Sequence, residues 1–251
     1  MELKDKVAFV TGGSGDIGSA IARVLATAGA DVAISYVGQL EAAAATVEAL
    51  RAAGRRSLTV QLDQRDPAAI DVSVDTVVRE FGRLDILVNN AAWNIGIPFT
   101  DLDALTADIW DRVLETNLRG PYLLARACAP HLRAHRAGRI VNIASLGGLF
   151  PASSSMAYSA SKAGLIHLTR CLAVALAPDV TVNCIAPGLV EGTRMAQRIP
   201  EAVVEMARQQ VVLRRVANIE DIAAQAVMFC QAESITGQVL VIDGGLPGGM
   251  H

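Results

Sequence analysis

Short apolar runs alternate with longer amphipathic segments along the whole chain. The short runs are rich in β-branched residues and apolar at nearly every position, which is typical of strands covered on both faces. These strands are predicted at Val7–Val10, Val32–Tyr36, Leu58–Leu62, Ile86–Val88, Ile140–Ile143, Thr181–Ile185 and Val239–Ile242.

Amphipathic segments with helical spacing fill the intervals between the strands, and Gly or Pro marks many of the joins. The predicted helices are Ile17–Ala28, Leu40–Ala53, Pro67–Phe81, Trp110–Arg133, Ala157–Ala177 and Ile219–Phe229. Strict alternation of strand and helix predicts an α/β fold with one doubly wound, parallel, seven-stranded sheet and helices on both faces. We expect residues 1–251 to form a single domain, with ligands bound beyond the carboxyl ends of the strands.

Composition and charge exclude several classes of protein. The chain has 251 residues, of which 52% are hydrophobic, and a formal net charge of −3. It therefore lacks the strong positive charge that would attract nucleic acids or anionic membranes. The longest uncharged stretch, 140–161, is rich in Ser and Gly and contains Pro151, so no membrane helix is expected. The amino-terminal residues show no leader pattern, and we expect a cytoplasmic protein.

Metal binding is not predicted. The four cysteines have no zinc spacing and stand in apolar surroundings, which favours reduced, buried thiols. His131 and His135 are four residues apart on a predicted helix, but no carboxylate or cysteine accompanies them.

A glycine-rich loop joins the first predicted strand to the first predicted helix. Gly13, Gly15 and Gly18 fit the pattern G-x-G-x-x-G. Glycine permits close backbone approach to a pyrophosphate, and the helix that follows offers its first N–H groups to that anion. The strand before and the helix after favour a dinucleotide site over a ligand-free turn.

The end of the second strand bears on the choice of dinucleotide. Asp31 opens that strand, so we expect it to be a surface loop residue remote from the ligand edge. Tyr36 closes the strand, and Val37, Gly38 and Gln39 follow without a carboxylate or a basic residue. NAD binding usually uses a carboxylate there for the ribose hydroxyls. Its absence favours NADP, with NAD left open.

Three residues can carry proton chemistry at the same edge. Tyr158 and Lys162 are four residues apart, so they share one helix face, and Ser145 closes the fifth strand. A tyrosine with a pKa of about 10 is poorly matched to neutral pH, and a nearby ammonium favours the phenolate. Ser145 lacks a Gly-x-Ser-x-Gly elbow, which argues against a serine hydrolase.

The order and spacing of these motifs resemble the short-chain dehydrogenase/reductase family over nearly the whole chain. The motifs are Thr11-Gly12 to Gly18, Asp63 after the third strand, Asn89-Asn90-Ala91-Ala92 after the fourth, Asn117, Ser145, Tyr158 to Lys162, and Pro187-Gly188 with Thr193. The resemblance implies a Rossmann fold and an NAD(P)-dependent oxidoreductase. Such an enzyme transfers hydride between the nicotinamide and a small, apolar ketone or secondary alcohol.

The resemblance also implies roles for individual residues. Tyr158 would be the general acid/base, Lys162 would lower its pKa and hold the nicotinamide ribose, and Ser145 would hydrogen-bond the substrate oxygen. Asn117 would support a water-linked proton path to Lys162. The implied cofactor-binding residues are Gly12, Ser14, Gly15, Asp16, Ile17, Gly18, Tyr36, Asp63, Gln64, Asn90, Ala91, Tyr158, Lys162, Pro187, Gly188, Val190 and Thr193.

Two positions depart from the family pattern. Asp16 stands where the family's middle glycine is usual, and a carboxylate there repels pyrophosphate unless it points away. We expect Asp16 to cap the helix and Gly15 to keep the close approach. Gly192 places Thr193 one residue later than in many relatives, which weakens its assignment to the nicotinamide amide.

The resemblance extends to substrate and assembly. The segment 189–212 is expected to cover the substrate, with Met195, Val203 and Met206 among its apolar wall residues. Similar 3-oxoacyl carrier-protein reductases often carry basic residues for an acidic carrier. Here Asp179 stands in one such position and Arg136 in the other, which favours a free small molecule. The helices Trp110–Arg133 and Ala157–Ala177 are expected to pack across the subunits of a homotetramer.

Two other functions stay open. One is a cofactor-binding, non-catalytic protein on the same fold. The other is an imine reductase or epimerase that uses the same site. An enoyl reductase is disfavoured, because those relatives space Tyr and Lys more widely.

Overall fold

A single parallel sheet forms the centre of the protein. In a computed structural model, which describes residues 1–151 and 154–247, its strands lie in the order β3-β2-β1-β4-β5-β6-β7 and every pair is parallel. The strands are β1 Val7–Val10, β2 Asp31–Tyr36, β3 Ser57–Gln61, β4 Ile86–Asn89, β5 Gly138–Ile143, β6 Val180–Pro187 and β7 Val239–Ile242. All seven predicted strands are confirmed, with bounds within two residues of the predicted ones.

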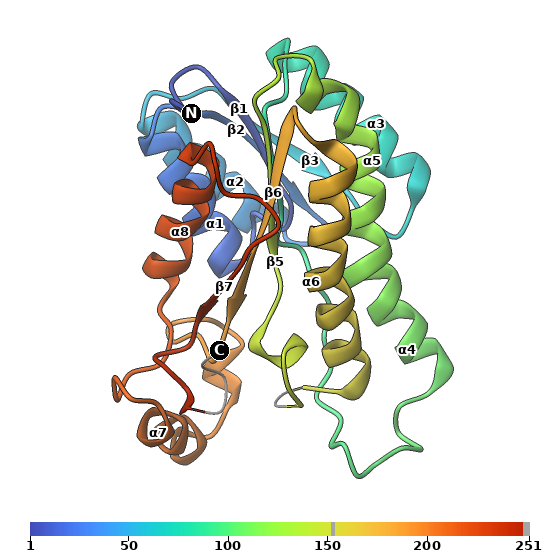
Figure 1. The fold of residues 1–251 in the computed structure, drawn as a ribbon, viewed down its shortest axis with the longest axis vertical. Coiled ribbons are helices and arrows are strands. Elements are labelled where there is room, and N and C mark those ends of the chain that lie inside the picture. Colours follow the sequence, from blue (N-terminus) through green and yellow to red (C-terminus); the bar gives the residue numbers. More distant parts are fainter. Residues whose placement is uncertain (152–153, 248–251) are drawn as a thin grey trace.

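Helices cover both faces of the sheet, as predicted (Figure 1). One layer contains α1, α2 and α8, and the other contains α3, α5 and α6. The helices are α1 Asp16–Thr27, α2 Leu40–Ala52, α3 Pro67–Phe81, α4 Ala107–Leu114, α5 Gly120–Arg133, α6 Met156–Leu176, α7 Glu201–Gln210 and α8 Ile219–Gln231. Each layer has its own apolar core against the sheet.

The strand order reverses between β1 and β4. From β1 the chain continues outward to β2 and β3, and then returns to β4 on the other side of β1. The carboxyl ends of neighbouring strands diverge at such a point, and ligands bind in the resulting crevice. The loops after β1, β4, β5 and β6 all lie along this edge, which brings the predicted site residues together.

The predicted helix Trp110–Arg133 is wrong as one continuous element. It begins at Ala107 and is interrupted by a π-helical turn, Glu115–Arg119, before α5 continues. The N–H of Gly120 donates to the carbonyl of Glu115, five residues earlier. Turns of this kind are frequent at functional sites, and this one contains Asn117.

Asp31 is not the surface loop residue that the sequence predicted. It is the first residue of β2 and only 8% exposed. Its carboxylate accepts hydrogen bonds from Arg55 Nε at 3.1 Å and from the Arg56 N–H at 3.0 Å. It does lie at the amino-end edge of the sheet, remote from the ligand edge. Its role is therefore to join β2 to the start of β3.

The segment 189–212 contains helical structure that the sequence did not predict. A short 3₁₀ turn at Ala196–Arg198 is followed by α7, which lies beyond one end of the sheet (Figure 1). Arg208 pairs with Glu191, Glu201 and Glu205 at 2.6, 3.0 and 3.1 Å. Met195, Val203 and Met206, which were expected in a substrate wall, are about half exposed.

Three further observations concern membranes, cysteines and metals. No helix in residues 1–151 or 154–247 is both long and apolar enough to span a bilayer. Cys128, Cys184 and Cys230 are buried as expected, but Cys171 is exposed, which corrects the prediction for that residue. Within the same ranges no three His, Cys, Asp or Glu side chains gather as a metal site.

Candidate active site

Glycine is required at three positions of the loop after β1. Gly12 has a φ of +67°, in the left-handed region. A Cβ on Gly13 would lie 2.4 Å from Ile34 Cβ, and one on Gly18 would lie 2.4 Å from the Gly12 carbonyl oxygen. A Cβ on Gly15 would meet nothing closer than 3.2 Å. Gly12, Gly13 and Gly18 are thus demanded by packing, whereas Gly15 leaves its side of the loop open.

The beginning of α1 offers unpaired donors. In the described part of the chain, the N–H groups of Asp16 and Ile17 have no acceptor. The N–H of Ser19, further into the helix, donates to the Gly15 carbonyl. First-turn N–H groups with no partner are the usual ligands of a phosphate. The loop therefore fits the pyrophosphate of a dinucleotide, with Ser14, Gly15, Asp16 and Ile17 around it.

Two of the predicted cofactor-binding residues, Asn90 and Gln64, hydrogen-bond the backbone around the crevice. Asn90 Nδ2 donates to the Thr11 carbonyl at 2.9 Å, and Thr11 Oγ1 accepts from the N–H groups of Asn90 and Ala91, both at 3.0 Å. Gln64, which is 4% exposed, donates to the carbonyls of Ala91 and Thr116 at 3.1 and 2.6 Å. Asn90 and Gln64 therefore shape the crevice through their side chains.

Two residues border the crevice at the ends of β2 and β3. Tyr36 ends β2 and is partly buried. Asp63 follows β3, and Arg65 Nη2 lies 2.5 Å from its Oδ2. Hydrogen bonds from Arg65 lower the pKa of the Asp63 carboxyl, so Asp63 stays ionised at neutral pH and can accept but not donate.

The predicted catalytic residues meet beyond the end of β5. Ser145 follows β5 and caps a 3₁₀ turn, Leu146–Gly148, by accepting from the Gly147 N–H at 3.2 Å. Tyr158 lies in the first turn of α6. Sequence reasoning missed Ser155, which is fully buried and accepts from the Tyr158 N–H at 3.2 Å. The N-cap signal before an apolar helix was available for this residue.

Burial shifts the pKa values of Tyr158 and Lys162 in opposite directions. Burial raises the pKa of Tyr158, and only a hydrogen bond with Ser145 opposes that shift. Burial lowers the pKa of Lys162 to about 8. Lys162 Nζ donates to the Ile143 carbonyl at 2.8 Å and lies 5.6 Å from the centre of the Tyr158 ring. That Lys162 lowers the Tyr158 pKa remains a prediction.

Asn117 connects the π-helical turn to the site. It is fully buried, exchanges hydrogen bonds with both backbone groups of Trp93 at 2.8 and 2.9 Å, and donates to Ser161 Oγ at 3.2 Å. Among the described residues, no hydrogen bond joins its side chain to Lys162. Asn117 therefore fixes the loop after β4 against α6, and the water-linked proton path remains a prediction.

The loop after β6 closes the other side of the crevice. Gly188 packs so tightly that a Cβ would lie 2.9 Å from Asp243 Cβ. Val190 is buried, and its carbonyl accepts from Thr193 Oγ1 at 2.9 Å. Thr193 is only 7% exposed, and Gly192 before it has a φ of +77°. In this conformation the Thr193 hydroxyl donates within its own loop. This agrees with the weakened assignment of Thr193 to the nicotinamide amide.

Asp16 does not cap α1, contrary to prediction. The N-cap position belongs to Gly15, and no side chain caps this helix. The Asp16 carboxylate instead accepts from the Arg194 N–H at 2.8 Å and lies 3.2 Å from Arg194 Nε. Because these residues are 178 positions apart, no local sequence pattern could have revealed the pair.

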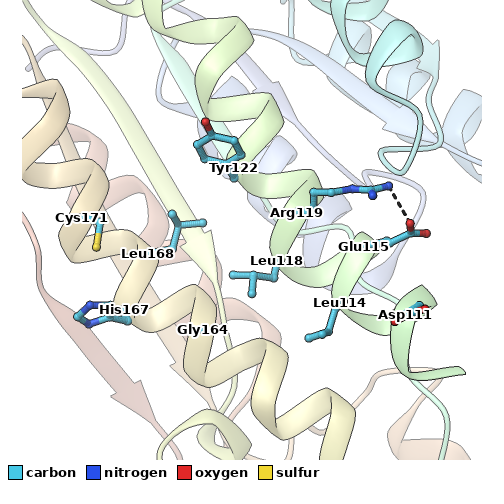
Figure 2. Close-up of a pocket in the computed structure, with 10 residues that line it drawn as sticks. All are labelled: Asp111, Leu114, Glu115, Leu118, Arg119, Tyr122, Gly164, His167, Leu168 and Cys171. Atoms are coloured by element: carbon cyan, nitrogen blue, oxygen red, sulfur yellow. Dashed lines mark ion pairs between the residues drawn. The ribbon is translucent and has the colours of Figure 1, made fainter. Parts of the chain in front are cut away.

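A groove of about 590 Å³ lies elsewhere, on the outer surface of the layer formed by α4, α5 and α6 (Figure 2). Its walls are mainly apolar, with an ion pair between Glu115 and Arg119 at 3.0 Å along one side. The lining residues are Asp111, Leu114, Glu115, Leu118, Arg119, Tyr122, Gly164, His167, Leu168 and Cys171. None of the predicted site residues lines it.

Comparison with known proteins agrees with this geometry. A family model described as enoyl-(acyl carrier protein) reductase matches residues 13–247. A cis-4-hydroxycyclohexanecarboxylate dehydrogenase of Sinomonas cyclohexanicum is 37% identical over 96% of each chain. A 3-oxoacyl-(acyl-carrier-protein) reductase of Staphylococcus aureus is 36% identical over 96% of this chain and 98% of that protein.

Solved structures with known dinucleotides share the whole fold. A short-chain dehydrogenase from Burkholderia cenocepacia in complex with NADP has 40% identity and a TM-score of 0.90, covering 98% of this chain and 99% of that one. An NAD⁺-bound xylitol dehydrogenase has 30% identity and a TM-score of 0.91, covering 98% and 100%. The chain therefore belongs to the short-chain dehydrogenase/reductase family of NAD(P)-dependent oxidoreductases.

Proposed function

We propose that this enzyme interconverts a small, apolar ketone and its secondary alcohol, with Tyr158 as the general acid/base. The observation that carries the proposal is the meeting of Ser145, Tyr158 and Lys162 at the carboxyl edge of the sheet, next to the glycine loop. When bound, the nicotinamide donates the hydride to the carbonyl carbon or accepts it from the alcohol carbon.

Each residue has a separate task in this proposal. The Ser145 hydroxyl donates to the substrate oxygen and polarises the carbonyl. Tyr158 gives its phenolic proton to that oxygen during reduction, and a raised pKa keeps the proton available at neutral pH. Lys162 holds the nicotinamide ribose, and its ammonium stabilises the phenolate once it forms.

NADP is the proposed dinucleotide. No carboxylate follows β2, where Val37 is exposed and Gly38 has open space around it. A 2′-phosphate would therefore meet no negative charge at this corner. Among the similar solved structures, one contains NADP, one contains NADPH and one contains NAD⁺.

A free small molecule is the proposed substrate rather than a carrier-bound one. Arg136, the one basic residue in a carrier-docking position, follows α5 and therefore lies at the amino-end edge of the sheet, opposite the site. Its Nε lies 3.4 Å from Asp179 Oδ1, which offsets its charge. The acyl-carrier reductases among the relatives make a carrier-bound 3-oxoacyl group the second candidate.

A cytoplasmic homotetramer is the proposed form of the enzyme. The apolar groove of Figure 2 lies on α5 and α6, the helices expected to pack across subunits. Exposed Cys171 and His167 at its rim would be covered by a second copy. Free, buried thiols at three other positions suit a reducing compartment.

The first test is titration of the purified protein with NADPH and NADH, followed by nicotinamide fluorescence and thermal stability. NADPH is expected to bind more tightly and to raise the melting temperature more. A screen of ketones and secondary alcohols with product analysis then identifies the substrate. Turnover of imines or epimerisation without net oxidation would replace the proposed reaction with one of the alternatives, and binding without any turnover would favour a non-catalytic protein.

A further inference from the structure

The loop that faces the pyrophosphate contains a negative charge. Asp16 is the first residue of α1, next to the unpaired N–H groups that suit a phosphate. A carboxylate at this point opposes the binding of a dianionic pyrophosphate, so the site needs a compensating cation.

The cation comes from the segment that follows β6. Arg194 binds Asp16 through its N–H and its guanidinium, at 2.8 and 3.2 Å. Its Nη2 donates to the Ser14 carbonyl at 3.0 Å, and its Nη1 donates to Gln39 Oε1 at 2.9 Å. One guanidinium thus bridges the glycine loop, the start of α1 and the residue before α2.

The bridge lies on the open side of the loop. A Cβ on Gly15 would lie 3.9 Å from Arg194 Nη2, and the Arg194 side chain is 47% exposed. The guanidinium therefore retains a face toward solvent at the corner where the dinucleotide phosphates bind. Guanidinium groups suit phosphate oxygens because they donate two parallel hydrogen bonds.

We propose that Arg194 is a dinucleotide-binding residue that cancels the charge of Asp16, so that the segment 189–212 supplies part of the phosphate site. The inference rests on the proposed function, because it needs a bound nicotinamide dinucleotide. It assigns to this segment a second role besides covering the substrate. It also accounts for an aspartate in a position where glycine is usual.

A double-mutant cycle on dissociation constants tests the proposal. The variants are Arg194→Ala, Asp16→Asn and the double variant, titrated with NADPH, NADH and ADP-ribose by fluorescence, or by calorimetry for ADP-ribose. Arg194→Ala is expected to weaken all three ligands by about tenfold, because Asp16 is left unbalanced. Asp16→Asn in the Arg194→Ala background is expected to recover most of that loss.

ADP-ribose contains the pyrophosphate and no nicotinamide ring. Weaker binding of ADP-ribose therefore reports the lost charge at the pyrophosphate, and not a lost contact between the segment 189–212 and the nicotinamide. Arg198→Ala is the matched control in the same segment, because the Arg198 side chain is exposed and has no partner in the described residues. Its dissociation constants are expected to stay within twofold of the wild type.

The inference is overturned if Arg194→Ala binds ADP-ribose like the wild type, or if the double variant binds no better than Arg194→Ala. Failure of the proposed function gives a different pattern, in which the wild type itself binds none of the three ligands. Thermal melts of each variant without ligand show whether a weaker titration comes from an unfolded protein.

Discussion

The ammonium of Lys162 donates a hydrogen bond to the Ile143 carbonyl, 2.8 Å away at the carboxyl end of β5. Lys162 is 2% exposed, and Tyr158 lies one helical turn before it. A strand end and a helix face thus meet around one buried cation. This cation is hydrogen-bonded to the backbone and lies 5.6 Å from the centre of the Tyr158 ring.

Replacing Tyr158 by Phe is expected to leave the dissociation constant for NADPH within about twofold of the wild type. Turnover should fall by a factor of about 10² to 10⁴, because the proton donor is removed and the ring is kept. Fluorescence titration and steady-state rates on the same preparation measure the two quantities. Tyr122→Phe, on the outer surface of α5, is the control. Full activity in Tyr158→Phe would remove Tyr158 from the mechanism.

The pH dependence of stability should reveal the buried Lys162. Its pKa is lowered from 10.5 to about 8 by burial, so between these values the unfolded chain binds a proton that the folded protein does not. The free energy of unfolding therefore rises with pH in this window. Relative to Lys162→Met, the wild type should gain roughly 2 kcal/mol between pH 7 and pH 9.5. Urea unfolding at both pH values measures it, and parallel pH profiles would contradict it.

Asn117→Ala should destabilise the protein by about 2 kcal/mol, because the N–H and carbonyl of Trp93 lose their partner in a partly buried place. The matched change Asn94→Ala removes only a contact with Met195 Sδ at 3.6 Å and should cost less than about 0.5 kcal/mol. Denaturant midpoints of both variants give the comparison. Equal midpoints would mean that the π-helical turn does not depend on Asn117.

Asp31→Ala tests whether Asp31, at the amino-end edge of the sheet, is separate from the cofactor site at the carboxyl-end edge. Loss of the hydrogen bonds to Arg55 and Arg56 should destabilise the fold by about 1–3 kcal/mol and leave NADPH binding unchanged. Asp5→Ala removes a weaker, exposed contact with Arg55 at 3.5 Å and serves as the control. A weakened NADPH titration in Asp31→Ala would place this carboxylate in the cofactor site after all.

Assembly can be tested at the groove of Figure 2. Cys171→Arg adds a charge to an exposed position in its wall and should dissociate the proposed tetramer without unfolding the subunit. Val72→Glu, on the exposed side of α3, should leave the assembly intact. Sedimentation velocity distinguishes the two results, and an unchanged Cys171→Arg assembly would move the interface to another surface.

The strands and the meeting of the candidate catalytic residues could be predicted because their signals are local. β1 and β4 are apolar at all or nearly all positions, and spacing alone puts Tyr158 and Lys162 on one face of α6. The order and spacing of the family's motifs supplied the rest of the candidate site.

Two of the errors share a physical cause, which is contact between residues far apart in sequence. Asp31 resembles a loop residue until Arg55 is placed beside it, and Asp16 resembles a helix cap until Arg194 reaches it. The helix α7 was missed because it is short and directs Val203 and Met206 toward solvent. Burial raises the pKa of Tyr158 and lowers that of Lys162, and the spacing of residues along a helix does not reveal burial.

The contact between Asp16 and Arg194 also limits how this enzyme can be re-engineered. Exchanging the segment 189–212 for that of a relative is an obvious route to a new substrate. A donor segment without an arginine at position 194 would leave Asp16 facing the phosphates alone, so the chimera would bind its cofactor more weakly as well as lose its old substrate. A successful exchange of the segment has to change Asp16 and Arg194 together.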